Sequence, residues 1–241
     1  MSQDSGLIID WVNMPTYNTI MALATGATLM SLAKIGQQLY KKEQINPLGW
    51  SLNLGVLSVL LFTTGLHMTL TWPLAKYFPF DNIVFGEPTL AIGVLALGLS
   101  FYFYKAKTSI LSSTTPFKEV ARVVWHLKYL LYGLGLSLIA IGIAGVTYQL
   151  FAAPPEEPIT GQFADYPMVE ATFISLLWAL TGVASILVPS VLHYFALGKT
   201  AITNKLKLTF ALLYGLGVIF LLFGAFNYFT HIGLIVNTMA K

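Results

Sequence analysis

The most regular feature of the chain is a succession of long apolar stretches separated by shorter polar connections. A helix that crosses a membrane needs about 20 consecutive, mostly apolar residues. Six stretches reach this length, at residues 17–40, 49–72, 87–105, 123–150, 170–197 and 207–234. The pattern therefore predicts an all-α fold, with residues 1–241 forming a single integral membrane domain built as a bundle of six transmembrane helices.

The composition supports a bilayer rather than water as the surrounding medium. Of the 241 residues, 56% are hydrophobic and only 10% are charged, against roughly 25% charged residues in ordinary globular proteins. So few charges exclude a soluble enzyme, a disordered regulator and a nucleic-acid-binding protein. The chain contains no cysteine, which excludes disulfides, thiolate zinc sites and cysteine-ligated iron–sulfur clusters.

The charged residues predict how the helices are oriented. Eleven of the 13 lysines and arginines fall within residues 34–48, 105–128 and 199–207. Eight of the ten acids lie in the segments on the other side of the spans, namely Asp4, Asp10, Asp81, Glu87, Glu156, Glu157, Asp165 and Glu170. Because cytoplasmic loops carry an excess of basic residues, we expect three cytoplasmic connections and both termini on the outer side.

An internal repeat relates the even-numbered spans. The sequence LYGLG at residues 131–135 recurs at residues 213–217, and LGV at residues 54–56 stands 80 residues before LGL at residues 134–136. The odd-numbered spans show a weaker echo, an outer aspartate followed by a threonine: Asp10 and Thr19, Asp81 and Thr89, Asp165 and Thr172. We interpret the chain as three tandem helical hairpins of like orientation. The alternative is a chance match between spans rich in leucine and glycine.

The residues and motifs typical of most classes of enzyme and coupled transporter are absent from the sequence of the predicted spans. Glu87 and Glu170 stand at outer helix starts, where the positive end of the helix dipole favours an acid, and no acid is predicted at mid-membrane. This argues against a proton- or sodium-coupled transporter. The chain has no Gly-x-Ser-x-Gly motif and no glycine-rich phosphate-binding loop, so neither a hydrolase nor a transferase is indicated. The enzyme class left open is a membrane oxidoreductase.

The four histidines are the strongest candidates for chemistry. All lie within or at the ends of predicted spans, His67 and His231 toward the outer face and His126 and His193 toward the inner face. A pair of imidazoles inside a membrane is a natural set of axial ligands for a haem iron or, less favourably, a chlorophyll magnesium. The arrangement predicts two haem b sites, one held by His67 and His231 and the other by His126 and His193.

A second interpretation of the histidines, and of the function, stays open. His126 is flanked by Trp125 and Lys128, and tryptophan and lysine are common residues at a membrane interface. The haem hypothesis implies electron transfer, with a quinone or another membrane-complex subunit as partner. The alternative is a cofactor-free bundle, either a scaffold subunit of a larger complex or a transporter of a neutral or lipidic molecule.

Several short motifs carry a resemblance to a known family. They are Tyr17-Asn18-Thr19 at a helix start, Thr71-Trp72-Pro73-Leu74, Asn82-Ile83 and Phe85-Gly86-Glu87-Pro88. On these motifs the chain resembles, over residues 15–235, a family of uncharacterised polytopic membrane proteins of bacteria and archaea. The resemblance implies the same architecture in a prokaryotic plasma membrane, and it implies no activity. Separately, the histidine pattern is similar in topology to that of cytochrome b561-like proteins.

Overall fold

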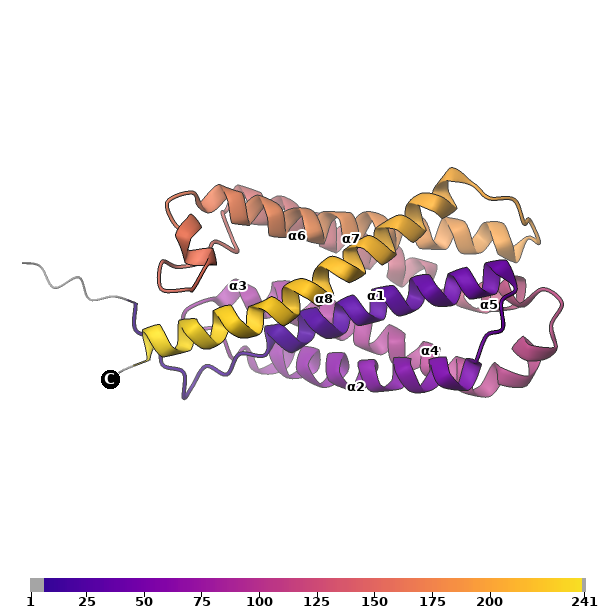
Figure 1. Ribbon diagram of the computed structural model, residues 1–241, viewed down its shortest axis with the longest axis horizontal. Coiled ribbons are helices and arrows are strands. Elements are labelled where there is room, and N and C mark those ends of the chain that lie inside the picture. The colour runs from indigo at the N-terminus through magenta and orange to yellow at the C-terminus, as the bar shows by residue number, and fades with distance from the viewer. Residues whose placement is uncertain (1–6, 240–241) are drawn as a thin grey trace, which may run out of the picture.

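The computed structural model describes residues 7–239, which form a bundle of helices (Figure 1). Six helices are long and apolar enough to cross a membrane, which confirms the predicted all-α architecture and fits an integral membrane protein. Their principal segments are α1 (Asn18–Lys41), α2 (Pro47–Thr71), α4 (Glu87–Ser112), α6 (Lys128–Thr147), α7 (Pro167–Ala196) and α8 (Asn204–Thr238).

Two of the six helices, the third and the fourth, begin about two turns earlier than the hydropathy pattern predicts. The short helix α3 (Pro79–Asp81) and the π-helical turn η1 (Asn82–Gly86) run without a break into α4. Likewise α5 (Pro116–Val124) and the turn η2 (Trp125–Leu127) run into α6. In both cases a proline occupies the first helical turn, where its missing N–H has no intrahelical partner to lose. The third span therefore contains Asp81, which the sequence analysis had placed in the outer connection.

The connections sort to two ends of the bundle (Figure 1). One end, here called the terminal end, holds the first and last described residues of the chain, the connection between α2 and α3, and the connection between α6 and α7, which includes η3 (Thr160–Phe163). There the Ile9 N–H donates to the Thr238 carbonyl at 3.0 Å. The opposite end, the basic end, holds the three connections rich in lysine. Asp4 and Lys241 lie outside the described residues, and the side of the membrane that each end faces stays a prediction.

The helices pack as three tight pairs, α1 with α8, α2 with α4, and α6 with α7. Glycines let the backbones approach one another in each pair. An ideal Cβ on Gly93 of α4 would lie 2.5 Å from the Phe62 nitrogen of α2. A Cβ on Gly135 of α6 would lie 2.8 Å from the Gly182 carbonyl oxygen of α7. Small residues at such crossings are the usual means of close helix association in membranes.

The tight pairs follow the sequence repeat but join neighbouring hairpins. The repeated Gly55 and Gly135 face the odd-numbered span that follows each of them, and the repeated Gly217 faces Gly26 of the first span. The even-numbered spans therefore pack alike, as the repeat predicts. Their closest partners, however, are not the helices that share their own predicted hairpin, because each repeated glycine lies on the face turned toward the next hairpin.

Larger side chains fill the seams between the tight pairs. Leu29, Leu177, Leu216 and Phe220 form a buried cluster that joins α1 and α8 to α7. At the basic end, Phe117 of α5 stacks on Phe195 of α7 with ring centroids 4.1 Å apart, and Tyr40 of α1 packs edge-on against Phe195. These aromatic rings close the basic end. At the terminal end the three pairs surround a cavity.

Candidate functional site

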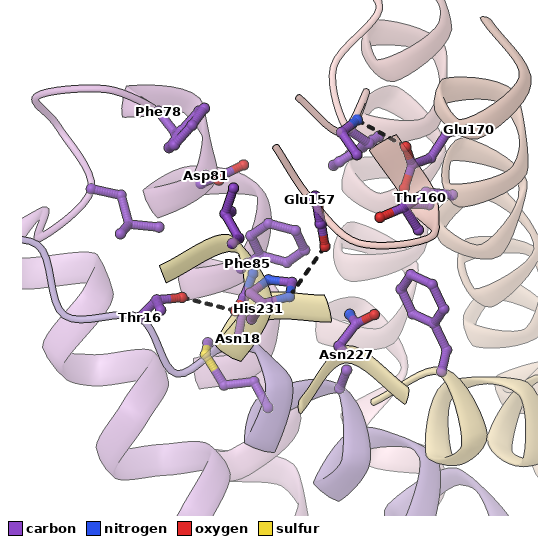
Figure 2. Close-up of a pocket in the computed structure, with 18 of the residues that line it drawn as sticks. Thr16, Asn18, Phe78, Asp81, Phe85, Glu157, Thr160, Glu170, Asn227 and His231 are labelled. Atoms are coloured by element: carbon purple, nitrogen blue, oxygen red, sulfur yellow. Dashed lines mark hydrogen bonds and ion pairs between the residues drawn. The ribbon is translucent and has the colours of Figure 1, made fainter. Parts of the chain in front are cut away.

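A cavity of about 220 Å³ opens at the terminal end, and all three tight pairs contribute to its wall (Figure 2). Its lining comes from α1, from the helical run around η1, from α7, from α8, and from the connection between α6 and α7. Pockets for drug-sized molecules usually have roughly 300–1,000 Å³. The cavity is therefore suited to a small organic molecule.

Aromatic rings form much of the cavity wall. Phe85 of η1 lies between two of them, with its ring centroid 5.9 Å from Trp178 and 6.1 Å from Phe151. Trp178 also packs against Phe220 of α8, with centroids 5.8 Å apart. Trp178 is only 7% exposed, and its indole N–H has no hydrogen-bond partner. A buried tryptophan N–H usually finds an acceptor, so this donor is left unsatisfied by the described residues.

Polar side chains line the same cavity. Figure 2 shows Asp81 and Phe85 approaching from one side, Glu157 and Glu170 from the other, and His231 and Asn227 between them on α8. No lysine or arginine lines the cavity in the part of the chain that the structure describes. Polar and ionisable groups at membrane depth are costly and usually mark a functional site.

The three carboxylates of the cavity differ in their partners. Glu170 Oε2 accepts a hydrogen bond from the Ala153 N–H at 2.8 Å, which ties the connection between α6 and α7 to the start of α7. Glu157 Oε1 lies 3.5 Å from His231 Nδ1 (Figure 2). The carboxylate of Asp81 has no hydrogen bond or ion pair to any described side chain. Asp81 is thus the carboxylate left for a bound molecule.

The two outer histidines have separate partners. His67 is exposed and does not line the cavity, and its Nδ1 lies 2.5 Å from the Tyr17 hydroxyl. His231 lines the cavity and contacts Glu157 and the Thr230 hydroxyl, the latter at 3.2 Å. The described side chains include no contact between the two imidazoles. Ligation of one haem by His67 and His231 stays a prediction that this geometry does not favour.

The two inner histidines share a tryptophan as neighbour. The His193 ring stacks on Trp125 with centroids 4.9 Å apart, and the His126 ring lies edge-on to the same indole at 5.6 Å. Lys128 Nζ lies 3.5 Å from the centre of that ring system. Both histidines are exposed, as at a membrane interface. Their ligation of a second haem also stays a prediction.

The cavity residues are not recognisable as a site from the sequence. The hydropathy pattern indicates that Glu170 is a helix-start acid and that Asp81 lies in an outer connection, and it indicates no role for Glu157 or Trp178. The signal that was present is Pro79, a helix-starting residue two positions before Asp81. A helix that begins at Pro79 carries Asp81 into the bundle.

The family match agrees with the resemblance found in the sequence. The chain belongs to DUF981, a family of proteins of unknown function, whose family model matches residues 14–233. No curated protein matches the chain. No solved structure matches it either. Because the family has no assigned activity, the case for a function rests on the geometry of the cavity.

Proposed function

We propose that this protein is a membrane carrier that binds a small organic molecule in the cavity at its terminal end and moves it across the bilayer. The observation that carries the proposal is that all three tight pairs contribute to the wall of one cavity. The shape of the cavity therefore depends on how the pairs are placed relative to one another. By the charge distribution, the terminal end would face the outside.

The packing indicates that each tight pair can move as a rigid body and that the contacts between pairs can open. Within a pair, glycines such as Gly93 and Gly135 bring backbone against backbone, so a pair resists internal displacement. Between pairs, the contacts are made by side chains, which can repack. Many carriers work by rocking such units around a central binding site.

The two ends of the bundle differ as a carrier requires. The terminal end gives access to the cavity, whereas the basic end is closed by the rings of Tyr40, Phe117 and Phe195. The structure would then represent the state open toward the terminal end. A scaffold subunit, the other cofactor-free alternative, has no need of a polar cavity between its helices.

The absence of native cysteines allows a direct test with single reporter cysteines. Asn227 is 8% exposed and lines the cavity, about three turns from the terminal end of α8. Leu61 lies at a similar depth in α2, is fully buried and does not line the cavity. Each variant, Asn227→Cys and Leu61→Cys, is reconstituted into vesicles and treated with a membrane-impermeant maleimide from either side.

A carrier predicts that Asn227→Cys reacts from both sides and that Leu61→Cys reacts from neither. Reaction from the basic end should be slower by about tenfold or more, since a minor conformation is populated at roughly 0.1–10%. Exposed reporters at Val12→Cys and Ile202→Cys define the two sides, because their residues lie at opposite ends of the bundle. If Asn227→Cys reacts from one side alone, the protein binds a ligand without carrying it across the membrane. If it reacts from neither side, the cavity is not open and the proposal is wrong.

A further inference from the structure

We infer that the molecule bound in this cavity is a small organic cation, a protonated amine joined to an aromatic body that carries a hydrogen-bonding group. The inference rests on the proposed function and names the class of its substrate. Three features of the cavity carry it: the sign of its charges, the aromatic wall, and two polar groups without partners.

The charges of the cavity favour a cation. Asp81, Glu157 and Glu170 line it, and no lysine or arginine does so among the described residues. His231 also lines the cavity and can carry a positive charge, but its imidazole contacts Glu157. In surroundings of low dielectric constant the ionised form of these acids attracts a cation and repels an anion more strongly than it would in water.

Asp81 is placed to receive the ammonium group. Glu157 is engaged by His231 and Glu170 by the Ala153 N–H, whereas the Asp81 carboxylate is unengaged by described side chains. Phe85, one turn further along the same helical run, is part of the cavity wall beside it (Figure 2). An ammonium group at Asp81 would therefore gain both a charge-assisted hydrogen bond and a cation–π contact.

The spacing of the acids favours an extended cation over a metal ion. Among the described residues, no three His, Cys, Asp or Glu side chains are grouped closely enough to hold a metal ion. A molecule with an apolar body fills the space between them and lies against the rings of Phe85, Trp178 and Phe220. The volume of about 220 Å³ limits this body to a single ring with short substituents.

The unpartnered indole of Trp178 indicates a second polar group on the ligand. Its N–H is buried and has no acceptor, and a ligand with a hydroxyl oxygen would satisfy it. Tyramine combines the required features: an ammonium group, one aromatic ring and a phenol oxygen. We use it as a probe of the class, together with the neutral isostere 4-(2-hydroxyethyl)phenol and the anionic analogue 3-(4-hydroxyphenyl)propionate.

The test measures binding of the three probes to the full chain in nanodiscs by calorimetry at pH 7. Tyramine should bind, and the neutral isostere and the anionic analogue should bind at least about tenfold more weakly, as expected for loss of one hydrogen bond to a charged group. Asp81→Asn should weaken the binding of tyramine by a similar factor and leave the affinity for the neutral isostere unchanged. Asp81→Glu, which keeps the charge, should restore most of the affinity.

Glu87→Gln is the matched control, because Glu87 is an exposed acid of the same helical run that does not line the cavity. If Asp81→Asn fails to fold, Trp178→Phe serves instead and should weaken the binding of tyramine several-fold. Equal binding of tyramine and its neutral isostere, or no binding of tyramine, overturns the inference of a cation. The carrier proposal falls separately, if Asn227→Cys reacts with the maleimide from one side of the membrane alone.

Discussion

The contacts inside the three helix pairs and the contacts between them are of different kinds. Inside a pair, glycine brings one backbone onto another: a Cβ on Gly224 of α8 would lie 2.5 Å from the Leu23 nitrogen of α1. Between pairs, rings and branched side chains meet, such as Trp178 with Phe220. The cavity lies between pairs, and no glycine is among the residues that line it.

This difference separates stability from function in the bundle. In lipid, the hydrophobic effect does not drive helices together, so close backbone packing supplies much of the association energy. The pairs can therefore hold the fold, while the seams between them are free to carry polar groups and a cavity. Substitutions inside pairs should act mainly on stability, and substitutions at the seams mainly on access to the cavity.

The largest effect is expected from glycines inside the pairs. Gly135→Ala and Gly217→Ala each place a methyl group against backbone atoms of the partner helix, 2.8 Å from the Gly182 oxygen and 2.8 Å from the Met30 nitrogen. Overpacking of this kind typically costs about 1–3 kcal/mol. We expect a lower midpoint of thermal unfolding, measured as loss of the monodisperse species in size-exclusion chromatography in mild detergent.

The repeat supplies the control for this prediction. Gly133 and Gly215 occupy the first glycine position of the same LYGLG motif, and a Cβ on either meets nothing within 4 Å. Alanine there should leave the midpoint unchanged or raise it, because alanine favours a helix over glycine by up to about 1 kcal/mol. Equal losses for the first and second glycines of the motif would contradict the distinction between pairs and seams.

A smaller effect is expected at the contact between His231 and Glu157, which joins α8 to the connection between α6 and α7. The two side chains are 19% and 10% exposed, so the contact is partly shielded from water. His231→Ala should cost about 1 kcal/mol of folding stability. It should also increase proteolysis of the connection, residues 148–166, with little effect on the packing inside pairs.

His67→Ala is the comparison for His231→Ala. His67 is exposed, its partner Tyr17 lies near the same end of the bundle, and its loss should change stability by no more than about 0.5 kcal/mol. The same two variants test the haem prediction. Ligation by His67 and His231 requires a Soret band in the visible spectrum of the purified protein, and both variants should lose the part of that band that belongs to this haem.

The number and position of the helices could be predicted because bilayer thickness sets the length of an apolar stretch. The repeated glycines could also be found, and they do lie at close helix contacts. The partner helix could not be predicted, because a glycine indicates that a backbone comes near without indicating which one. Gly217 at the end of the chain faces Gly26 near its start, a contact that only the closed arrangement of pairs produces.

The candidate site was harder to predict than the fold. The sequence placed His67 and His231 toward one face, but the direction of a ring depends on packing, and the two imidazoles have different partners. Asp81 was missed because an acid in the first turns of a helix has the same hydropathy as an acid in a loop. The role of Trp178 depends on an unpartnered N–H, which is a property of the folded structure alone.

The smallest effect is expected where the N-terminal segment meets the connection between α2 and α3. Asp10 accepts a hydrogen bond from Asn13 at 3.0 Å and lies 3.4 Å from Lys76 Nζ. The Asn13 hydrogen bond, followed by Lys76, lowers the pKa of Asp10 from its ordinary value. A lowered pKa in the folded state stabilises the protein above the ordinary value of about 3.9, and this stabilisation is lost as the pH falls through the folded-state pKa.

Because Asp10 and Lys76 lie in contact with solvent, water and salt screen their attraction. Asp10→Asn should therefore leave the unfolding midpoint at pH 7 within about 1 °C of that of the unsubstituted protein. The small difference should shrink further as the pH falls through the folded-state pKa of Asp10, because the carboxylate then becomes protonated. If Asp10→Asn lowers the unfolding midpoint at pH 7 as much as His231→Ala does, then the surface contact between Asp10 and Lys76, and not only the cavity lining, holds two helix pairs together.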